Sequence, residues 1–511
     1  MPKYNISDDL RRIAKGEVLS DEWSRKIYSV DASNYTTIPE IIIRVKETEE
    51  ISEICRYATY KNKSITARGA GTGLLGQSLT DGISLDFTKN MNKIIELENN
   101  YVVVQPGIVK AVLDKELKKR NKIFPVDPAS SNYCTIGGMI ANNSSGIHAL
   151  GYGSTIDFLE QLEVVYSDGI VNSLKSSHLS SLPNTKEYEK IRKLKELLSP
   201  NVLGLIRLKY PKVTKNSCGY RLDSVIENGD FHPQKLIAAS ESTLGIITLA
   251  KFRILDLPLF KYTLVMGFSN VLLAVRHIPT ILKYLPSALE LLDSSVFCYK
   301  KNSENAKNGL VYTTINDGCL LYVEFTGNNH SKIDRNFLNC KKTLSEYAEI
   351  LETSYDTISS DRIWDSRKNV LNNVMKMTVG SRKPVGLIED TVVDATHLFD
   401  YLKFLLLQYK KYKMAYVLYG HAGNGNIHTR PLIDIENKFE LEKLKALADK
   451  LFSKVFSLYG SISAEHGDGL GRVEYISKMY GFEINNLFKS IKNIFDPFNI
   501  MNPGKKIPYP F

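Results

Sequence analysis

The sequence predicts an α+β protein of two or three domains, on the basis of three observations. Its 511 residues exceed the size of one ordinary domain. Apolar residues make up 43% of the chain, which is enough for a packed core in each domain. Segments with strand periodicity and segments with helix periodicity alternate, but without the regular order of an all-parallel repeat.

The N-terminal half opens with a strand, a helix and a second strand. The two strands are expected at residues 41–45 and 64–67. In the helix between them Thr48 is the expected N-cap, and acidic residues follow in the first turn. One apolar face of this helix is formed by Ile51, Ile54, Cys55 and Ala58. The elements expected next are strands at residues 101–105 and 162–166 and a helix near residues 109–120.

Two features divide the chain. Residues 172–217 are rich in Ser, Lys and Leu and are predicted to form a helical insertion. The segment from Leu255 to Pro258 marks a boundary, and beyond it strands and helices alternate in a second unit to about residue 460. Early in that unit, a strand at residues 264–268 is expected to lead into a helix that Ser269 caps.

The net charge of +10 arises from 66 basic and 56 acidic residues that are spread along the chain. Basic runs such as residues 118–120 and 410–413 are better explained by a solvated face than by nucleic-acid binding, because no reader motif accompanies them. Attraction to anionic substrates or to an anionic membrane surface stays open.

The six cysteines include no Cys-x-x-Cys pair, which excludes an iron–sulfur run and a zinc ribbon. Redox chemistry would therefore need an organic cofactor. The N-terminus lacks a basic region followed by an apolar core, so no secretory signal is predicted. The longest apolar-leaning stretch, residues 262–275, is shorter than the ~20 residues of a membrane span. We expect a cytoplasmic protein without a transmembrane segment and leave peripheral membrane contact open.

Two glycine-rich stretches, residues 68–77 and 134–146, are the strongest functional signal. The first contains Gly71-x-Gly73-x-x-Gly76, the spacing of the dinucleotide fingerprint. A turn and a strand follow it, with Ile83, Leu85 and Phe87 alternating, so the helix of a Rossmann unit is missing. A loop between strands can still offer backbone N–H groups to phosphate oxygens.

The alternative explanation is that these glycines only occupy turns with positive φ. Ligand binding by these stretches is favoured over a purely structural role for two reasons. The second stretch carries polar residues beside its glycines, and a third, shorter glycine-containing segment follows at residues 241–248. The polar residues of the second stretch are Asn142, Asn143, Ser144 and Ser145.

The C-terminal half concentrates histidines in two polar segments. His421 is expected at the end of a strand and His428 on the return strand of a hairpin. Glu465 and His466 adjoin a glycine turn, which would let both side chains serve one site. Two imidazoles and a carboxylate form the ligand set of a catalytic zinc-type site. Each histidine alone would be better explained as a hydrogen-bonded structural residue, but together they favour a metal site with His466 as the base.

These segments together resemble one family. In chain order they are residues 68–77, 125–132, 137–153, 241–248, 421–428, 465–469 and 502–505. They resemble the FAD-linked D-2-hydroxyacid dehydrogenases of the vanillyl-alcohol oxidase superfamily, from about residue 35 to the C-terminus. The chain looks most like the group that contains D-lactate, glycolate and D-2-hydroxyglutarate dehydrogenases.

The resemblance implies a two-lobed PCMH-type FAD-binding domain over residues 1–257, with an extension at 1–36 and the insertion at 172–217. It implies an α/β cap domain for the substrate at 258–460, and a C-terminal segment at 461–511 that packs on the FAD domain.

The resemblance also implies the site residues. The cofactor-binding set would be Arg68, Gly69, Gly71, Thr72, Gly73, Gly76, Gln77, Pro128, Ser131, Thr135, Gly137, Gly138, Asn142, Gly146, Gly153, Glu241, Gly245, Ile247 and Asn502. His421, His428 and Glu465 would bind a divalent metal such as zinc, and His466 would be the base. Arg367 would hold the substrate carboxylate, with Arg430, Lys383 and Asn426 as further substrate residues. A surface helix position is an equal alternative for Arg367.

The chain departs from the family pattern at Leu371, where a threonine is common, and near Asp390, where Arg382 and Lys383 would replace a lysine. The implied activity is oxidation of a D-2-hydroxy acid by noncovalent FAD, since no histidine lies in residues 68–77. Because the chain ends without the iron–sulfur half of larger relatives, electrons would leave to a quinone, a cytochrome, an electron-transfer flavoprotein or a separate iron–sulfur protein. A homodimer is left open.

Three rival functions are retained. The first is an FAD-containing transferase resembling alkylglycerone-phosphate synthase. The second is a glycine-rich zinc hydrolase, which would be colourless. The third is a flavin subunit that is silent without an iron–sulfur partner.

Overall fold

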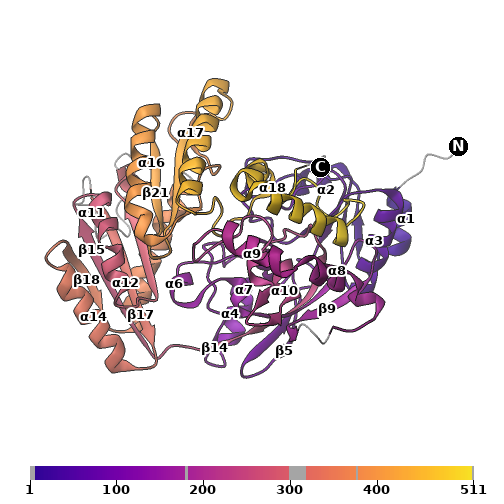
Figure 1. Ribbon diagram of the computed structural model, residues 1–511, viewed down its shortest axis with the longest axis horizontal. Helices are drawn as coiled ribbons and strands as arrows, with labels where there is room; N and C mark the ends of the chain where they lie inside the picture. The colour runs from indigo at the N-terminus through magenta and orange to yellow at the C-terminus, as the bar shows by residue number, and fades with distance from the viewer. Residues whose placement is uncertain (1–5, 179–181, 299–317, 376–377, 509–511) are drawn as a thin grey trace.

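The structure is a computed structural model that describes residues 6–178, 182–298, 318–375 and 378–508. Its elements form two regions that lie side by side in Figure 1, one built on the sheets of the N-terminal half and one on a large sheet of the C-terminal half. In the described ranges, no helix combines the length and the hydropathy of a membrane-spanning helix.

The first sheet has the strand order β1-β2-β4-β3. Its strands are β1 (Glu17–Leu19), β2 (Ile41–Arg44), β3 (Ile65–Arg68) and β4 (Ile83–Asp86), with α1 (Ile6–Ile13), α2 (Glu22–Tyr28) and α3 (Thr48–Lys61) as its helices. Helix α3 buries the apolar face that the sequence predicts. The predicted N-cap is wrong: Glu47 holds that position, and the Thr48 hydroxyl donates instead to Glu163.

The second sheet has the order β5-β6-β13-β8-β9, and all its neighbours are antiparallel. Its strands are β5 (Ile94–Leu97), β6 (Tyr101–Val104), β8 (Leu159–Val165), β9 (Val171–Lys175) and β13 (Ile246–Arg253). Its helices are α4 (Lys110–Lys118), α5 (Ile136–Asn142), α6 (Ala149–Tyr152), α7 (Thr155–Phe158) and α10 (Pro233–Ile237), and β7 (Lys122–Ile123) pairs with β14 (Leu255–Asp256). The strands and the helix predicted in this half are confirmed.

The segment predicted as a helical insertion is only partly helical. It contains α8 (Glu189–Leu197) and α9 (Pro200–Lys209), with η1 (Lys186–Tyr188) before them. Its beginning is β-structure, since it starts in β9 and continues into β10 (Ser177–His178). Strand β10 joins β12 (Asp230–Phe231) and β11 (Ile226–Glu227) in a small sheet, with η2 (Leu222–Ser224) nearby.

The large sheet has the order β18-β15-β17-β16-β21-β22-β19, and β20 also pairs with β22. Its strands are β15 (Phe260–Phe268), β16 (Ala288–Asp293), β17 (Cys319–Gly327), β18 (Glu349–Ser354), β19 (Lys383–Pro384), β20 (Thr391–Val392), β21 (Tyr416–His421) and β22 (Asn426–Ile433). Its helices are α11 (Val271–Arg276), α12 (Ile278–Leu282), α13 (Ser295–Cys298), α14 (His330–Leu344), α15 (Thr357–Met375), η4 (Ala395–His397), α16 (Leu398–Tyr412) and α17 (Lys438–Ser457).

Both faces of this sheet are buried, and strand alternation explains how. Leu264 belongs to the core cluster that includes Phe337 of α14, whereas its neighbour Val265 belongs to the cluster that includes Trp364 of α15. Helix α15 thereby packs on the opposite face from α14. The predicted cap of the following helix is wrong by one residue, because the side chain of Asn270 accepts the hydrogen bond from the helix N-terminus.

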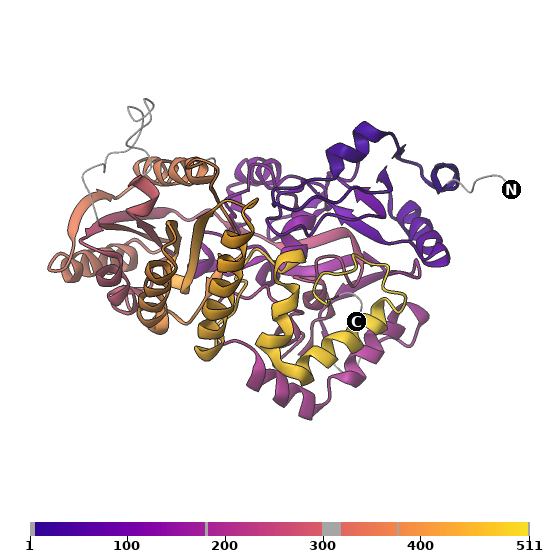
Figure 2. The same ribbon diagram turned by 90° about the horizontal axis from the view of Figure 1, so that it is seen from above.

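The chain then returns to the N-terminal region. Helix α18 (Gly469–Phe495) packs against α8 and α9, as the yellow ribbon in Figure 2 shows. Beyond it, Ile65 of β3 exchanges backbone hydrogen bonds with Ile500 and Asn502. Residues 500–502 therefore lie along the first sheet, next to the first glycine-rich stretch.

Candidate active site

A cavity of about 400 Å³ lies where the two regions meet. One side is lined by residues that belong to the segments 69–78 and 128–145, and we call these lining residues the glycine wall. The other side is lined by Arg367, Tyr419, His421, His428, Arg430, Glu465 and His466, which we call the ionisable wall. Glu241 and Ser242, from the third glycine match, also line the cavity.

The first loop of the glycine wall presents bare backbone to the cavity. Gly71 has a φ of +67°, a conformation that side chains rarely adopt. The amide N–H groups of residues 70–74 donate to no acceptor within the described part of the chain. Because unpaired backbone donors are costly unless a ligand or water meets them, this loop suits an anionic ligand such as a pyrophosphate.

The second glycine-rich stretch is mostly helical. Residues 136–142 form α5, and the Thr135 side chain caps it by accepting from the amide of Gly138. Pro128, Thr135, Gly138 and Asn142 line the cavity. A Cβ at Gly69 would lie 2.1 Å from the Thr135 hydroxyl oxygen, so Gly69 permits the two stretches to touch.

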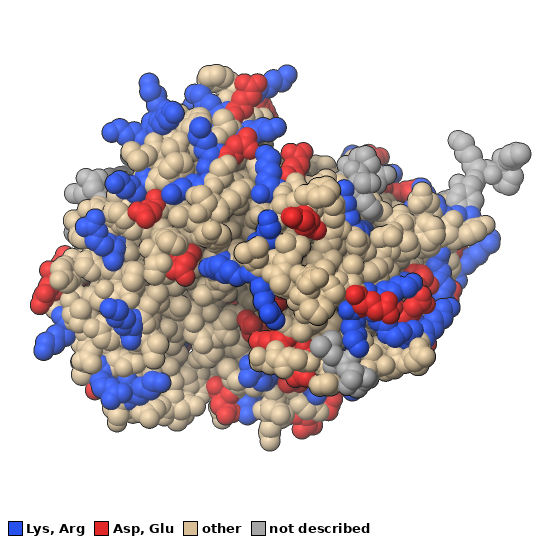
Figure 3. Space-filling view, in the orientation of Figure 1, with Lys and Arg blue, Asp and Glu red and all other residues tan. Residues whose placement is uncertain are grey.

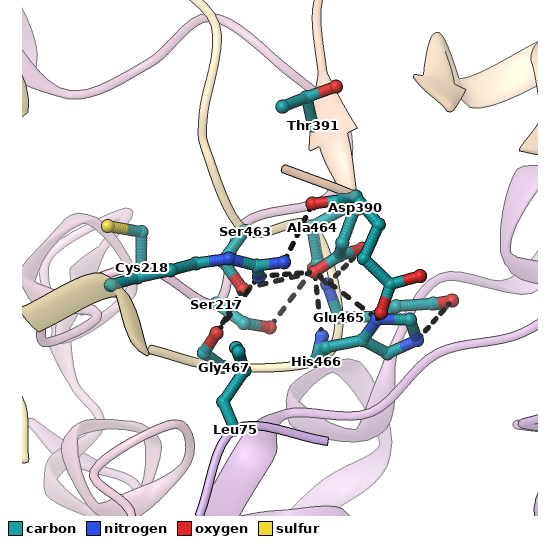
Figure 4. Close-up of polar contacts among 12 residues, drawn as sticks. Leu75, Ser217, Cys218, Asp390, Thr391, Ser463, Ala464, Glu465, His466 and Gly467 are labelled. Carbon is teal, nitrogen blue, oxygen red and sulfur yellow. Dashed lines mark hydrogen bonds and ion pairs between the residues drawn. The ribbon is translucent and has the colours of Figure 1, made fainter. Parts of the chain in front are cut away.

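The main-chain peptide of His466 is hydrogen-bonded to both glycine-rich stretches and to Asp390. Its carbonyl oxygen accepts hydrogen bonds from Gln77 at 2.6 Å and Asn142 at 3.5 Å, and its amide donates to Asp390 at 2.9 Å. Figure 4 shows Asp390 above the turn that carries Glu465 and His466. Gly467, with a φ of +80°, allows that turn. Both glycine-rich stretches thus fix the position of the predicted base.

Three imidazoles converge on a single carboxylate oxygen. The Nε2 atoms of His421, His428 and His466 lie 3.2, 3.4 and 3.5 Å from Glu465 Oε1. The hairpin explains the placement of the first two, since β21 ends at His421 and β22 brings His428 back opposite Tyr419. Within β22, His428 and Arg430 are two residues apart and therefore face the same side.

Two buried glutamates orient these imidazoles, and neither was predicted from the sequence. Glu290 in β16 accepts from His421 Nδ1 at 2.6 Å and forms an ion pair with Arg367. Glu389 lies 3.1 Å from His466 Nδ1 and 2.7 Å from Arg430. Such carboxylates behind imidazoles fix the ring and raise its basicity.

The pKa values follow from these pairings. Burial alone would lower the pKa of His466, but Asp390 and Glu389 outweigh it and raise the value to about 9. Burial also disfavours charge on His421, yet Glu290 raises its pKa. His428 lacks comparable support, so burial lowers its pKa. The pKa values of His466 and His421 are therefore shifted upwards and that of His428 downwards.

Several carboxylate and imidazole atoms are close enough to share a cation. Those of Asp390, His428, Glu465 and His466 lie within 4.8 Å of one another. Asp390 is poorly suited as a ligand, because its oxygens accept from two backbone amides, from Ser463 and from Arg472. His421, at 3.2 Å from Glu465 Oε1, fits better in its place.

Some predicted cofactor and substrate residues lie away from the cavity lining. They are Arg68, Gly76, Ser131, Gly137, Gly146, Gly153, Gly245, Ile247, Lys383, Asn426 and Asn502.

Contacts within the protein explain why most of these residues are absent from the cavity lining. A Cβ at Gly146 would lie 2.2 Å from the Asp127 carbonyl oxygen, and one at Gly245 would lie 2.4 Å from Val164.

Arg68 donates to the carbonyls of Tyr28 and Val30. The Asn502 amide donates to the carbonyls of Gln77 and Glu241, which positions two lining residues. Ile247 is a core residue.

The remaining substrate residues differ in burial. Lys383 is exposed on edge strand β19. Asn426 is fully buried behind the ionisable wall, where its amide donates to Thr391 O at 3.2 Å. Arg367 is 1% exposed, which excludes the surface helix position that was its alternative. Leu371 lies in α15, where its side chain is outside the described residues.

Comparison with known proteins agrees with this geometry. Residues 39–175 match the family model of an FAD binding domain, and residues 257–506 match that of the C-terminal domain of FAD linked oxidases. The chain belongs to the FAD-linked oxidases. This confirms the family that the sequence motifs resemble.

Curated relatives cover nearly the whole chain. The chain is 28% identical to D-2-hydroxyglutarate dehydrogenase of Haemophilus influenzae, over 98% of this chain and 51% of that protein. It is 29% identical to glycolate oxidase subunit GlcD of Bacillus subtilis, over 98% and 96%. It is 25% identical to D-lactate dehydrogenase of Anaerostipes hadrus, over 97% and 94%. The chain thus spans about half the length of the D-2-hydroxyglutarate dehydrogenase it matches.

Solved structures share the fold. The 4-ethylphenol oxidase of Gulosibacter chungangensis has a TM-score of 0.70 at 14% identity, covering 98% of this chain and 97% of that one. A p-cresol methylhydroxylase has a TM-score of 0.68 at 16% identity, covering 98% and 96%. An alkyldihydroxyacetonephosphate synthase has a TM-score of 0.66 at 17% identity, covering 98% and 87%. The PCMH-type fold that the resemblance implies is confirmed.

Proposed function

We propose that this FAD-linked oxidase family member oxidises a D-2-hydroxy acid of the lactate, glycolate or 2-hydroxyglutarate type to the 2-oxo acid. The observation that carries the proposal is the convergence of three imidazole Nε2 atoms on Glu465 Oε1, opposite the glycine wall. Relatives named as dehydrogenases or oxidase subunits for such acids support it. The transferase rival rests on likeness of fold alone, at 17% and 18% identity.

The glycine wall would hold FAD without a covalent bond. Its donors suit the pyrophosphate, because the N–H groups of residues 70–74 meet no acceptor among the described residues and Gly71 and Gly73 leave the backbone uncovered. Pro128, Thr135, Gly138, Asn142 and Glu241 would border the rest of the cofactor. When bound, FAD supplies the acceptor for the α-hydrogen and its electron pair.

The ionisable wall would hold the acid. Arg367 and Arg430 each have one glutamate partner, and a guanidinium carries five N–H donors, so donors remain for a substrate carboxylate. Both arginines line the cavity and Lys383 does not, which favours the arginines. His421, His428 and Glu465 would bind a divalent metal, which supplies positive charge beside the substrate oxygens.

His466 would remove the hydroxyl proton through Nε2. Glu389 lies at its Nδ1 and stabilises the imidazolium that results, so the ring is oriented for proton transfer. A neutral ring is needed for this step, and a divalent cation beside Glu465 opposes protonation of His466 by charge repulsion. The proton and the hydride leave the acid from its hydroxyl oxygen and its α-carbon, which yields the 2-oxo acid.

The test is the visible spectrum of the purified protein before and after anaerobic addition of D-lactate, glycolate or D-2-hydroxyglutarate. We expect a flavin spectrum that at least one acid bleaches. A colourless protein would contradict the proposal and favour a hydrolase. A yellow protein that no acid bleaches, with turnover of an acyl-glycerone phosphate, would favour the transferase. Bleaching that begins only after an iron–sulfur protein is added would identify a subunit.

A further inference from the structure

One buried lysine in the site belongs to none of the motifs found in the sequence. Lys215 lies near the end of the segment predicted as an insertion, between α9 and η2. It is 2% exposed. Neighbours on both sides reach the same region: Thr214 accepts from Asn424, and Ser217 donates to Ala464 O. The end of this segment is therefore part of the site's framework.

The ammonium group of Lys215 contacts the candidate metal-binding carboxylate. Its Nζ lies 3.1 Å from Glu465 Oε2, and the Ser145 hydroxyl donates to the same oxygen at 2.6 Å. The three imidazoles lie around the other oxygen, Oε1. The two oxygens of one carboxylate thus have separate surroundings, one with fixed donors and one with imidazole nitrogens.

Lys215 also connects three segments that are distant in the sequence. Besides Glu465, its Nζ lies 3.4 Å from Gly146 O and 3.4 Å from Asn426 Oδ1. These partners come from the end of the second glycine-rich stretch, from strand β22 and from the turn before α18. A compact ammonium with three rotatable donors suits three acceptors in different directions.

The position of Lys215 excludes direct contact with a substrate in the cavity. Its side chain is absent from the residues that line the cavity, whereas Glu465 is among them. Any effect of Lys215 on the chemistry must therefore pass through the groups that it contacts.

We propose that Lys215 is a positioning residue that holds Glu465 by Oε2, so that Oε1 alone faces the imidazoles and the metal. The inference rests on the proposed function in that it takes Glu465 as a metal ligand. Groups that hold a ligand from behind typically change metal affinity 10–100-fold when they are removed. Without Lys215, Glu465 can rotate about its side-chain bonds, and its two oxygens lose their distinct surroundings.

The variant Lys215→Met keeps the length of the side chain and removes its charge and donors. We expect its Zn²⁺ affinity, measured by competition with a chelator, to fall about 10–100-fold, while FAD content and the flavin spectrum stay as in the wild type. The matched control is Lys110→Met, which removes another buried lysine, paired with Asp114 outside the cavity. We expect wild-type Zn²⁺ affinity in this control.

Further variants separate positioning from general destabilisation. Lys215→Arg retains charge and donors, and we expect it to recover part of the lost affinity. Adding Lys215→Met to Glu465→Gln should change Zn²⁺ affinity no further, because the lysine acts through that carboxylate. If Lys215→Met fails to fold with FAD, Lys215→Leu is measured in the same way. Wild-type Zn²⁺ affinity in a folded neutral variant overturns the inference.

The two proposals fail in different ways. Wild-type protein that binds Zn²⁺ but is bleached by no acid contradicts the proposed function, and the loss of affinity in Lys215→Met still supports the inference. Bleaching of the wild type together with equal Zn²⁺ affinity in Lys215→Met supports the function and overturns the inference. A wild-type protein that binds no Zn²⁺ overturns the role given to Lys215.

Discussion

The two walls of the cavity are built on different principles. The glycine wall exposes backbone, and the amides of residues 70–74 donate to no acceptor in the described chain. The ionisable wall consists of ionisable side chains, and its two arginines have buried counter-charges, Glu290 for Arg367 and Glu389 for Arg430. The difference teaches that one wall offers backbone donors to a ligand. The other pairs its charges inside the protein and still keeps donors, such as Nε of Arg367 and of Arg430, that have no hydrogen-bond partner in the described part of the chain.

The space-filling view adds a contrast with the outer surface. Figure 3 shows lysines and arginines scattered over this face of the molecule, with the acidic side chains among them. Behind the cavity lining, by comparison, the carboxylates of Glu290 and Glu389 are 0% exposed and are matched by Arg367 and Arg430. The surplus positive charge of the chain therefore gives no information about its site.

The largest expected effect concerns the base of the ionisable wall. His466→Ala should slow bleaching of the flavin by the substrate by about 10²–10⁴-fold, because general base catalysis is lost. FAD should remain bound, because the glycine wall is unchanged. The exposed His397, changed to Ala, is the matched control and should bleach at the wild-type rate. Stopped-flow absorbance measures both, and an unaltered rate in His466→Ala refutes the assigned base.

Removal of metal should have the next largest effect. Dialysis against a chelator is expected to slow bleaching about 100-fold without loss of the flavin, because a bound metal stabilises developing charge by several kcal/mol, and added Zn²⁺ should restore the rate. The residual rate should rise with pH towards about 9, because His466 acts as a base only after it has lost its proton. Rates measured from pH 6 to 10 check this. A chelated protein with full activity would remove the metal from the mechanism.

A substitution in the glycine wall should weaken FAD binding and leave Zn²⁺ affinity unchanged, the reverse of what metal removal does. Gly71→Ala forces a side chain into a φ of +67°, which costs about 1–2 kcal/mol and should weaken FAD binding about tenfold. Zn²⁺ affinity should not change, because the proposed metal ligands lie on the other wall. Gly204→Ala is the control, since a Cβ there meets no atom within 4 Å. Fluorescence titration with FAD measures the affinity, and equal affinities would contradict the role of the first loop.

The smallest expected effect on activity is at a contact between the two regions. His148 lies 2.7 Å from Asp127 and 2.8 Å from Glu324 of β17. Burial opposes its charge, but these carboxylates raise the pKa of His148 well above its usual value. Its stabilising effect is therefore fully present below the unfolded pKa of about 6.5, and it is lost as the pH rises through the higher folded value.

His148→Gln should accordingly lower the free energy of unfolding by about 3 kcal/mol at pH 6. The difference from the wild type should shrink towards alkaline pH, as the wild-type imidazolium loses its proton. Denaturant unfolding curves at several pH values measure this. A difference that is constant with pH would show that the charge of His148 is unimportant.

Local sequence patterns predicted the helices and strands well but misplaced the N-caps of two helices. Alternation and amphipathic spacing located β2, α3, β6 and the β21–β22 hairpin. The caps at Thr48 and Ser269 were wrong by one residue, because several neighbouring polar residues can cap a helix and tertiary contacts decide between them. The glycines at 137, 146 and 245 could not be separated from those in the cavity lining, because any close backbone approach selects glycine.

The sequence by itself determined the glycine-rich loops and the histidines of the ionisable wall, since each depends on short-range spacing. Only the tertiary structure decided which groups surround them. Glu290, Glu389 and Lys215 belong to three distant segments without a motif. They became part of the site because β16, the residues before β20 and the segment between α9 and η2 meet the imidazoles and Glu465 there. Buried charges must be paired, and the partner is chosen by proximity in space rather than in sequence.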